Sequence, residues 1–376
     1  MIKVLNIISD SNIGGAGKCV LNFLKYYDRK KFAVKVVVPR GSLLKPEIEK
    51  LKTDVIEADG ITDKSLDRKA VKNLKKIIKR LNPDIVHTHG TMSGRIAAKL
   101  CGKKIIYTRH SVFPVSDRIS HGIGQKANKV INEFFSDRII AVAEAAKQNL
   151  TDSGISADRI DVILNGVEPL TPVSEEKKKE IRAKYGVTEN DFVLGILARL
   201  EPYKGHIYII EAAEMLKEKK IPVKIIIAGT GSSEEELKKT IAEKHLEDTV
   251  IMAGFVTDVS GLLSIMDVQL NASYGTEATS LSLLEGMSLG IPAVVSDFGG
   301  NPGVITDGEN GFIFPTKNST KLALCIKELY ENKDKYDYMS SKSKEIFSQK
   351  FTAKIYAENI EKEYAAVFEG GRKGGK

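Results

Sequence analysis

The sequence predicts an α/β protein of two domains, each with a doubly wound parallel β-sheet. Three observations lead to this fold class. The chain has 376 residues, enough for two domains of ordinary size. Short apolar segments alternate with longer amphipathic ones, as expected for parallel strands buried on both faces and joined by helices. The alternation starts again in the second half of the chain, so the pattern occurs twice.

Six apolar segments in the first half are interpreted as strands. They cover residues 3–9, 32–39, 84–89, 104–108, 138–142 and 160–164. A glycine-rich loop after the first of them leads into an expected helix at about residues 18–27. Five similar segments of the second half cover residues 192–197, 223–228, 250–252, 268–271 and 292–296. Two Rossmann-like domains account for both sets.

The domain boundary is expected at residues 169–180, where two prolines precede a run of charge, as in a linker that enters a helix. The N-terminal domain would then cover residues 1–168 and the C-terminal domain residues 169–352. A last helix, at about residues 353–368, is expected to pack back on the first domain, and the tail 369–376 is expected to be disordered. Ligands bind at the carboxyl ends of parallel strands, so two facing sheets would line an interdomain cleft.

The composition excludes several classes of protein. With 42% hydrophobic and 28% charged residues, the chain is neither collagen-like, disordered nor a coiled coil. No apolar stretch reaches the ~18 residues of a membrane-spanning helix, and the first residues lack the features of a signal peptide. Cys19, Cys101 and Cys325 are few and widely spaced, which favours a reducing compartment over a disulfide framework or a zinc cluster. We therefore expect a cytoplasmic protein.

Charge is distributed unevenly. Residues 1–170 hold 30 Lys+Arg and 18 Asp+Glu, a balance of +12; from totals of 57 and 49, the remainder has 27 and 31, a balance of −4. A basic half attracts phosphates, nucleic acid or an anionic membrane, unless it is only a solvated surface. The expected helix at residues 66–81 has an apolar side and a cationic side, the latter formed by Lys69, Lys72, Lys75, Lys76, Lys79 and Arg80. Such a helix could lie on an anionic membrane or simply carry a solvated basic face.

The loop after the first strand is rich in glycine. Gly14 and Gly15 allow backbone N–H groups to approach an anion, and the next helix directs its positive end there. The loop is not a Walker A motif, because Asn12 and Cys19 stand where that motif needs glycine and Ser or Thr. It is also a poor dinucleotide fingerprint, because Val20 stands where Gly or Ala belongs. Phosphate binding and a plain strand-to-helix turn both remain open.

Two cations follow the first strand of the second half. Arg199 and Lys204 are five residues apart. The planar guanidinium and the ammonium can converge on one diphosphate. The alternative is an ordinary pair of surface charges.

The segment from Glu277 to Met287 contains two acids eight residues apart. Thr279 or Ser280 is expected to cap a helix whose first turn is polar and uncharged, leaving its N–H groups for an outside anion. Glu285 would lie inside that helix, where a ribose diol could supply hydrogen-bond donors. At about 100° per residue, the two acids would come within ~80° of one face. The alternative is one exposed and one capping glutamate.

Three histidines lie at the ends of expected strands. His87 and His89 alternate so that they share one face of a strand, and His110 would enter the cleft. A metal pair is conceivable, but no acidic or cysteine ligand lies nearby in sequence. Hydrogen-bonded structural histidines are the favoured interpretation of the first two.

These segments belong to a wider set of motifs: Glu277 with Glu285 (Glu-x7-Glu), Arg199 with Lys204 (Arg-x4-Lys), Asn-Gly-Val at 165–167, and the blocks at 290–300 and 307–312. Together they resemble the retaining glycosyltransferases of family 4. The resemblance spans nearly the whole chain and implies the GT-B fold, two Rossmann-like domains facing a cleft. One position departs from the family pattern: Gly303 stands where an acid is frequent, which we interpret as tuning of a loop.

The resemblance implies a nucleotide-sugar donor held mainly by the second domain. By motif position, the diphosphate would be bound by Gly14, Gly15, Arg199, Lys204 and the amides of Ser280 and Leu281. Glu285 would bind the ribose, and the backbone of Phe255 and Val256 would bind the base. His110 and Glu277 would contact the sugar. Fixed cations would stabilise the departing diphosphate, so neither a metal nor another cofactor is expected.

The resemblance also implies transfer of a hexose or N-acetylhexosamine with retention of anomeric configuration. UDP is the favoured nucleotide, and the acceptor would be a saccharide or a lipid-linked molecule in surface polysaccharide or glycolipid assembly, with the enzyme in the cytoplasm or on the inner face of the membrane. The alternatives are a non-catalytic nucleotide-sugar-binding subunit and another GT-B enzyme such as an epimerase. Nucleic-acid binding is disfavoured because aromatic residues do not interleave with the basic ones.

Overall fold

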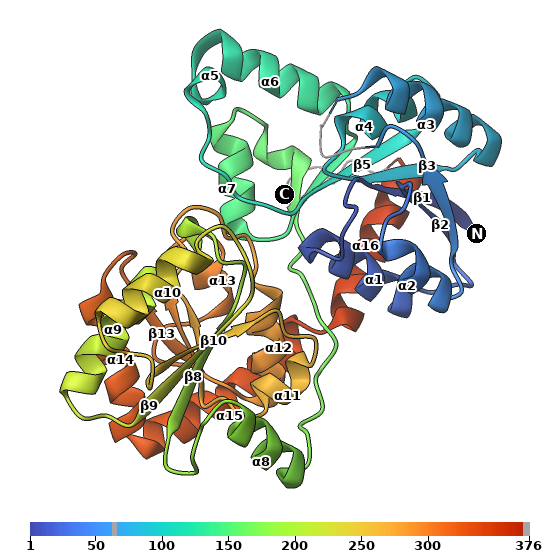
Figure 1. Ribbon diagram of the computed structural model, residues 1–376. Helices are drawn as coiled ribbons and strands as arrows, with labels where there is room; N and C mark the ends of the chain where they lie inside the picture. Colours follow the sequence, from blue (N-terminus) through green and yellow to red (C-terminus); the bar gives the residue numbers. More distant parts are fainter. Residues whose placement is uncertain (62–65, 371–376) are drawn as a thin grey trace. The chain divides into compact units, whose positions relative to one another are not determined.

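The computed structural model describes residues 1–61 and 66–370 and divides the chain into two compact units (Figure 1). Unit 1 consists of Met1–Val167 together with the C-terminal segment that begins at Thr352, and unit 2 consists of Glu168–Phe351. Each unit contains one parallel β-sheet with helices, so the predicted two-domain α/β class is confirmed. Most of the tail that was predicted to be disordered, residues 371–376, lies outside the described residues.

The sheet of unit 1 has seven parallel strands in the order β3-β2-β1-β4-β5-β6-β7. Their bounds are β1 Ile2–Ile8, β2 Phe32–Pro39, β3 Asp54–Ala58, β4 Ile85–His89, β5 Lys104–Arg109, β6 Arg138–Ala141 and β7 Ile160–Val162. All five residues of β4 are buried, as are the last five of β1, which explains their apolar sequences. In the register of these two strands, Asn6 lies opposite His87 and Ile8 opposite His89.

The described helices of unit 1 bury one apolar side each, except for two that have no buried residue. The helices are α1 Gly15–Tyr26, α2 Leu44–Lys50, α3 Arg68–Leu81, α4 Met92–Lys99, α5 Asp117–Ser120, α6 Gly122–Phe134, α7 Glu144–Asp152 and α16 Ala353–Phe368, with a 3-10 turn at Ala157–Arg159. In α3 the buried side is formed by Ala70, Leu74 and Ile78. The longer helix α6 has no buried residue, although its sequence is amphipathic.

Helix α16 belongs to unit 1 and packs against α1 (Figure 1). Tyr364 lies edge-on to Phe23 of α1, with ring centroids 5.6 Å apart. The entry to this helix is fixed by residues 165–167, since Val167 forms a parallel bridge with Thr352. A Cβ on Gly166 would lie 2.3 Å from the carbonyl oxygen of Thr352. The Asn-Gly-Val segment therefore needs its glycine for close packing of two chain segments that are far apart in sequence.

Unit 2 has a six-stranded parallel sheet in the order β10-β9-β8-β11-β12-β13. The strands are β8 Phe192–Leu197, β9 Val223–Ala228, β10 Val250–Gly254, β11 Val268–Asn271, β12 Ala293–Ser296 and β13 Gly311–Phe314. The helices are α8 Glu175–Lys184, α9 His206–Glu218, α10 Glu234–Glu243, α11 Val259–Leu263, α12 Leu281–Leu289, α13 Asn301–Val304, α14 Ser319–Glu331 and α15 Lys333–Lys350.

Three local features differ from the sequence-based expectations. The edge strands β3 and β13 were not predicted: β3 contains two acids and is only partly buried, and β13 is short and follows a loop. Helix α1 begins at Gly15, three residues before the expected start.

None of the described helices is long and apolar enough to cross a membrane.

Candidate active site

The loop after β8 carries Arg199. Its exposed guanidinium donates from Nη2 to the hydroxyl of Tyr203 at 3.0 Å. The loop after β9 packs against the backbone on both sides of Arg199. A Cβ on Gly229 would lie 1.9 Å from the carbonyl oxygen of the residue before Arg199, and a Cβ on Gly231 would lie 2.4 Å from that of the residue after it. These glycines therefore fix the stem from which Arg199 extends. Sequence analysis missed them, although Gly-x-Gly after a strand is a visible signal.

Lys204 closes the 3-10 turn Pro202–Lys204, and Gly205 follows with a φ of +73°. A Cβ on Gly205 would lie 2.1 Å from the carbonyl oxygen just after β11, so this position also requires glycine. The turn directs Lys204 into the interior, where Nζ lies 2.7 Å from Oε2 of Glu277. The predicted phosphate-binding lysine is thus paired with the predicted sugar-binding acid.

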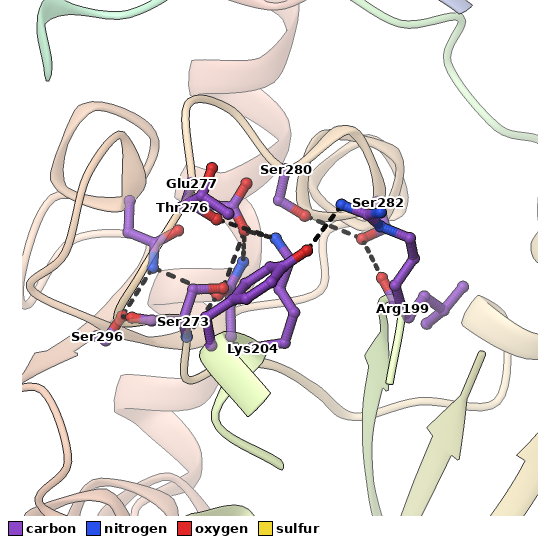
Figure 2. Close-up of polar contacts among 12 residues, drawn as sticks. Arg199, Lys204, Ser273, Thr276, Glu277, Ser280, Ser282 and Ser296 are labelled. Carbon is purple, nitrogen blue, oxygen red and sulfur yellow. Dashed lines mark hydrogen bonds and ion pairs between the residues drawn. The ribbon is translucent and has the colours of Figure 1, made fainter. Parts of the chain in front are cut away.

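Glu277 is a buried carboxylate, 7% exposed, with three donors on one oxygen (Figure 2). Besides Lys204, Oε2 accepts from Nδ2 of Asn271 at 3.1 Å and from the hydroxyl of Ser273 at 3.0 Å. A charge in such a place is tolerated only when it is paired and hydrogen-bonded, as it is here. Asn271 and Ser273 were missed by sequence analysis, because their role depends on β11 ending next to this acid.

The backbone of Glu277 is held by the loop that departs from the family pattern. Gly300 N donates to Glu277 O at 2.9 Å, and a Cβ on Gly299 would lie 2.2 Å from the same oxygen. Beyond it, Asn301 Nδ2 donates to the hydroxyl of Ser296 at 3.0 Å (Figure 2). A Cβ on Gly303 would meet no described atom within 4 Å, so the missing acid leaves this packing intact.

Two details predicted for the next helix are wrong. Helix α12 begins at Leu281, so Glu277 precedes it, and the helical angle used to bring Glu277 and Glu285 to one face does not apply. Ser280 occupies the N-cap position, but its hydroxyl contacts that of Ser282 at 3.0 Å and makes no capping bond in the described chain (Figure 2). The first turn is apolar and largely buried, because Leu281, Leu283 and Leu284 pack inward. Glu285 is half-buried in the middle of α12.

The residues expected at the base follow β10. Phe255 is 77% exposed, and Val256 is half-buried. Both line a hollow of about 130 Å³, together with Tyr185 and Asp258. An exposed aromatic ring beside a hollow gives a flat apolar surface after the carboxyl end of β10.

In unit 1, Gly14 is the N-cap and Gly15 the first residue of α1. Both are exposed, and a Cβ on Gly15 would meet no described atom within 4 Å. The N-terminal end of this twelve-residue helix is therefore open to an anion, as the sequence suggested.

The three histidines form one cluster, in which His87 and His89 are buried and His110 is partly exposed. The rings of His87 and His89 lie 4.3 Å apart, and His89 Nδ1 lies 2.9 Å from Nε2 of His110. Burial lowers the pKa of His87 to about 3 and that of His110 to about 4. No group of three or more His, Cys, Asp or Glu side chains that could hold a metal occurs among residues 1–61 and 66–370. His87 and His89 are hydrogen-bonded structural residues, which is the interpretation that the sequence favoured.

The predicted residues therefore fall into two groups. In unit 2, Lys204 and Glu277 are in direct contact, and Arg199, Phe255, Val256, Ser280, Leu281 and Glu285 lie on loops and helices that follow the carboxyl ends of strands. Gly14, Gly15 and His110 occupy the corresponding ends in unit 1. Two parallel α/β units, one with a lysine–glutamate pair and an arginine after its first strand, agree with the class of nucleotide-sugar-dependent glycosyltransferases with the GT-B fold.

Comparisons with known proteins agree with this class. The family described as Glycosyl transferases group 1 matches residues 177–346, and Glycosyltransferase Family 4 matches residues 13–169. EpsD of Bacillus subtilis, a relative whose name describes it as a glycosyltransferase, is 31% identical over 274 residues, covering 69% of this chain and 70% of EpsD. The chain belongs to the group 1 glycosyltransferases of the family 4 type.

Two further relatives bear on the function. The UDP-Gal:alpha-D-GlcNAc-diphosphoundecaprenol alpha-1,3-galactosyltransferase of Escherichia coli is 29% identical over 257 residues, covering 66% of each chain. Among solved structures, Anabaena HepE in complex with UDP and glucose superimposes with a TM-score of 0.84 at 23% identity, covering 97% of this chain and 100% of HepE. The structural likeness to HepE confirms the two-domain GT-B fold.

Proposed function

We propose that the protein is a retaining hexosyltransferase that moves a hexose or N-acetylhexosamine from a UDP-sugar to a saccharide or lipid-linked acceptor. The observation that carries the proposal is the buried Lys204–Glu277 pair, with Arg199 on the same loop as Lys204. This arrangement places a fixed cation beside a fixed anion, which suits a ligand with a diphosphate next to a hydroxyl-rich sugar.

The two units contribute different parts of the donor site. Lys204 Nζ donates to Glu277 and, at 3.3 Å, to the carbonyl oxygen of Thr276, so its third N–H can reach the diphosphate. Arg199 and the amides of Ser280 and Leu281 complete the phosphate site. From unit 1, Gly14, Gly15 and the open end of α1 supply further backbone N–H groups for the diphosphate.

The remaining residues select the rest of the donor. The free oxygen of the Glu277 carboxylate accepts from sugar hydroxyls, and Glu285 accepts from the ribose diol. The backbone at Phe255 and Val256 binds the base. His110 meets the sugar from the side of unit 1.

The reaction proceeds on one face of the sugar. The bond between the anomeric carbon and the β-phosphate oxygen breaks, the acceptor oxygen bonds to the same carbon from the same side, and the acceptor proton passes to the departing phosphate oxygen. Negative charge grows on the diphosphate and is stabilised by the two cations and the backbone amides. Because these positive groups are built into the chain, the reaction needs no metal.

Two relatives support the choice of UDP and of the acceptor. HepE has been crystallised with UDP, and the name of the Escherichia coli enzyme specifies a UDP-sugar and a diphosphoundecaprenol acceptor. We therefore place the reaction in surface polysaccharide or glycolipid biosynthesis, on the cytoplasmic side of the membrane.

A lipid-linked acceptor requires access to a membrane surface. The exposed cations of α3, such as Lys69, Lys72 and Arg80, can bind anionic headgroups. Helix α6 adds exposed apolar side chains, including Ile123 at 87% exposed and Val130 at 65%. Cations and unpartnered apolar residues in one unit are typical of reversible membrane binding.

The donor proposal is tested by incubating the protein with a panel of UDP-sugars and measuring release of UDP. One donor should be hydrolysed slowly, and Glu277→Gln should suppress this. The variant also leaves Lys204 without its partner, so we expect a lower melting temperature. Full turnover by Glu277→Gln, or no binding of any UDP-sugar by the wild type, would contradict the proposal.

The membrane proposal is tested by co-sedimentation with vesicles that contain phosphatidylglycerol. Binding should decrease with salt and in a Lys72→Glu/Lys76→Glu variant, because headgroup attraction is screened within about 10 Å at 0.1 M salt. Ile123→Ser should weaken binding at low salt too. Leu324→Ser, an exposed apolar position of unit 2, is the matched control.

A further inference from the structure

A continuous chain of buried polar side chains crosses the sheet of unit 1. It links α16, β1, β4 and β5 in the order Thr108, His87, Tyr364, Asn6, His89 and His110. Successive polar atoms are 2.6, 2.8, 3.5, 2.9 and 2.9 Å apart. The first five residues are buried, and His110, directly after β5, is partly exposed. The chain thus runs from the core to a residue of the candidate site.

The order of donors along this chain is fixed by Asn6. Its Oδ1 faces His89 Nε2 at 2.9 Å, and an amide oxygen can only accept, so Nε2 of His89 carries the proton. A neutral imidazole has one N–H, so Nδ1 of His89 must accept. The donor to it is Nε2 of His110, at 2.9 Å. Neutral His110 is then left with an unprotonated Nδ1.

Both rings are neutral at the pH of the cytoplasm. Burial lowers the pKa of His110 to about 4 and that of His89 well below its usual value. A protonated His87 or His110 would lower the pKa of His89 further, because like charges repel. A doubly protonated ring, which would reverse the donor order, is therefore excluded near pH 7.

The Nδ1 of His110 is the end of the chain. It is buried and has no hydrogen-bond partner within the part of the protein that the structure describes. The residues that follow, up to the start of α5 at Asp117, form neither helix nor strand. This Nδ1 therefore belongs to a residue at the carboxyl end of β5, next to a segment that is not part of the sheet.

We propose that Asn6 and His89 are positioning residues that hold His110 in the Nε2–H tautomer, so that its Nδ1 accepts a hydrogen bond from a hydroxyl of the transferred sugar. This inference rests on the proposed function, in which His110 meets the sugar. It assigns a role to two residues deep in the sheet that do not touch the ligand. If the Asn6 amide were turned around, every donor in the chain would be reversed and His110 would offer an N–H.

The tautomer is measured directly on the ligand-free protein. Protein labelled with ¹⁵N in its six histidines gives long-range ¹H–¹⁵N spectra that distinguish Nε2–H from Nδ1–H, with signals assigned through His89→Gln and His110→Asn. His89 and His110 should both be Nε2–H in the wild type. An Nδ1–H form of His110 would overturn the proposal, whether or not any variant folds.

The positioning role is measured with Asn6→Leu, which keeps the size of the side chain and removes its oxygen. The fixed tautomer of His110 should be replaced by a mixture of both. The control is Thr88→Val, which lies between the two histidines of β4 and bonds the carbonyl oxygen of Ile106 instead. It should leave the histidine signals unchanged.

Binding separates this inference from the proposed function. The UDP-sugar to test is the one that the wild type binds among UDP-glucose, UDP-galactose and UDP-N-acetylglucosamine. In Asn6→Leu its Kd should rise about twofold, because an even mixture leaves about half of the molecules in the binding tautomer. The Kd of UDP alone should not change. Equal Kd values for the UDP-sugar in both proteins would overturn the positioning role. Absence of UDP binding by the wild type would instead overturn the proposed function, and with it the sugar as ligand.

Discussion

At the scale of single residues, the site depends on how one carboxylate oxygen is shared. Oε2 of Glu277 accepts from Lys204, Asn271 and Ser273, and these three donors come from different parts of the chain. The charge is thereby stabilised although the side chain is only 7% exposed, and the carboxylate is held in one orientation. The other oxygen is then presented to a ligand in a fixed direction.

Removing one donor should loosen this arrangement. In Asn271→Leu we expect kcat to fall about tenfold and stability to decrease by ~1–3 kcal/mol, because a buried carboxylate loses a hydrogen bond. Steady-state kinetics and urea unfolding measure the two effects. The control is Asn318→Leu, which removes the N-cap of α14 by abolishing a bond to Lys321 N and should lower stability without changing kcat. An unchanged kcat in Asn271→Leu would contradict the role of Asn271.

His87 should make the protein sensitive to acid. Its pKa is lowered from 6.5 to about 3 by burial, so the unfolded chain binds a proton that the folded chain does not. Its contribution is fully present above pH 6.5 and is lost as the pH falls from 6.5 towards 3, by about 1.4 kcal/mol per pH unit. Urea unfolding between pH 7 and 5 should show this loss, with a shallower dependence in His87→Gln. Parallel curves for the two proteins would contradict it.

At the scale of elements, glycines decide where segments meet. A Cβ on Gly166 would clash with the carbonyl oxygen of Thr352, at the point where α16 enters unit 1. Gly166→Ala should therefore destabilise the protein by about 1–3 kcal/mol, since two backbone segments must separate. Thermal melting checks this. Gly303→Ala, at a position with open space, is the control and should melt like the wild type.

The same scale shows what sequence patterns can and cannot predict. The central strands were predicted nearly to their ends, because continuous apolar runs are required where both faces are buried. β3 was missed because an edge strand such as Asp54–Ala58 is solvated on one side and tolerates acids. The N-cap position of α12 was predicted correctly at Ser280, but its capping bond is not formed in the described chain, because the hydroxyl bonds that of Ser282 instead.

At the scale of the whole molecule, the chain should unfold in two transitions. Each unit has its own sheet and core, and unit 1 is completed only by the last helix. Tyr364→Ala should lower the free energy of unfolding of unit 1 by ~3–5 kcal/mol, because a fully buried ring of α16 is lost. Saturating UDP, at about 100 times its Kd, should raise the free energy of unfolding of unit 2 by ~2.7 kcal/mol. Differential scanning calorimetry measures both, and a single transition that shifts with both changes would contradict two independent units.

The sequence by itself determined the fold class, the family and the residue types of the site, because burial periodicity and motif spacing are local properties of the chain. Arg199, Lys204, Glu277 and Glu285 were chosen because their spacing matches the motifs of the family that the sequence resembles. Only the tertiary structure decided that Lys204 pairs with Glu277, that Asn271 and Ser273 share its oxygen, and that Asn6 sets the proton on His110. These contacts join residues from different strands and helices, and their geometry exists only after the sheets have assembled.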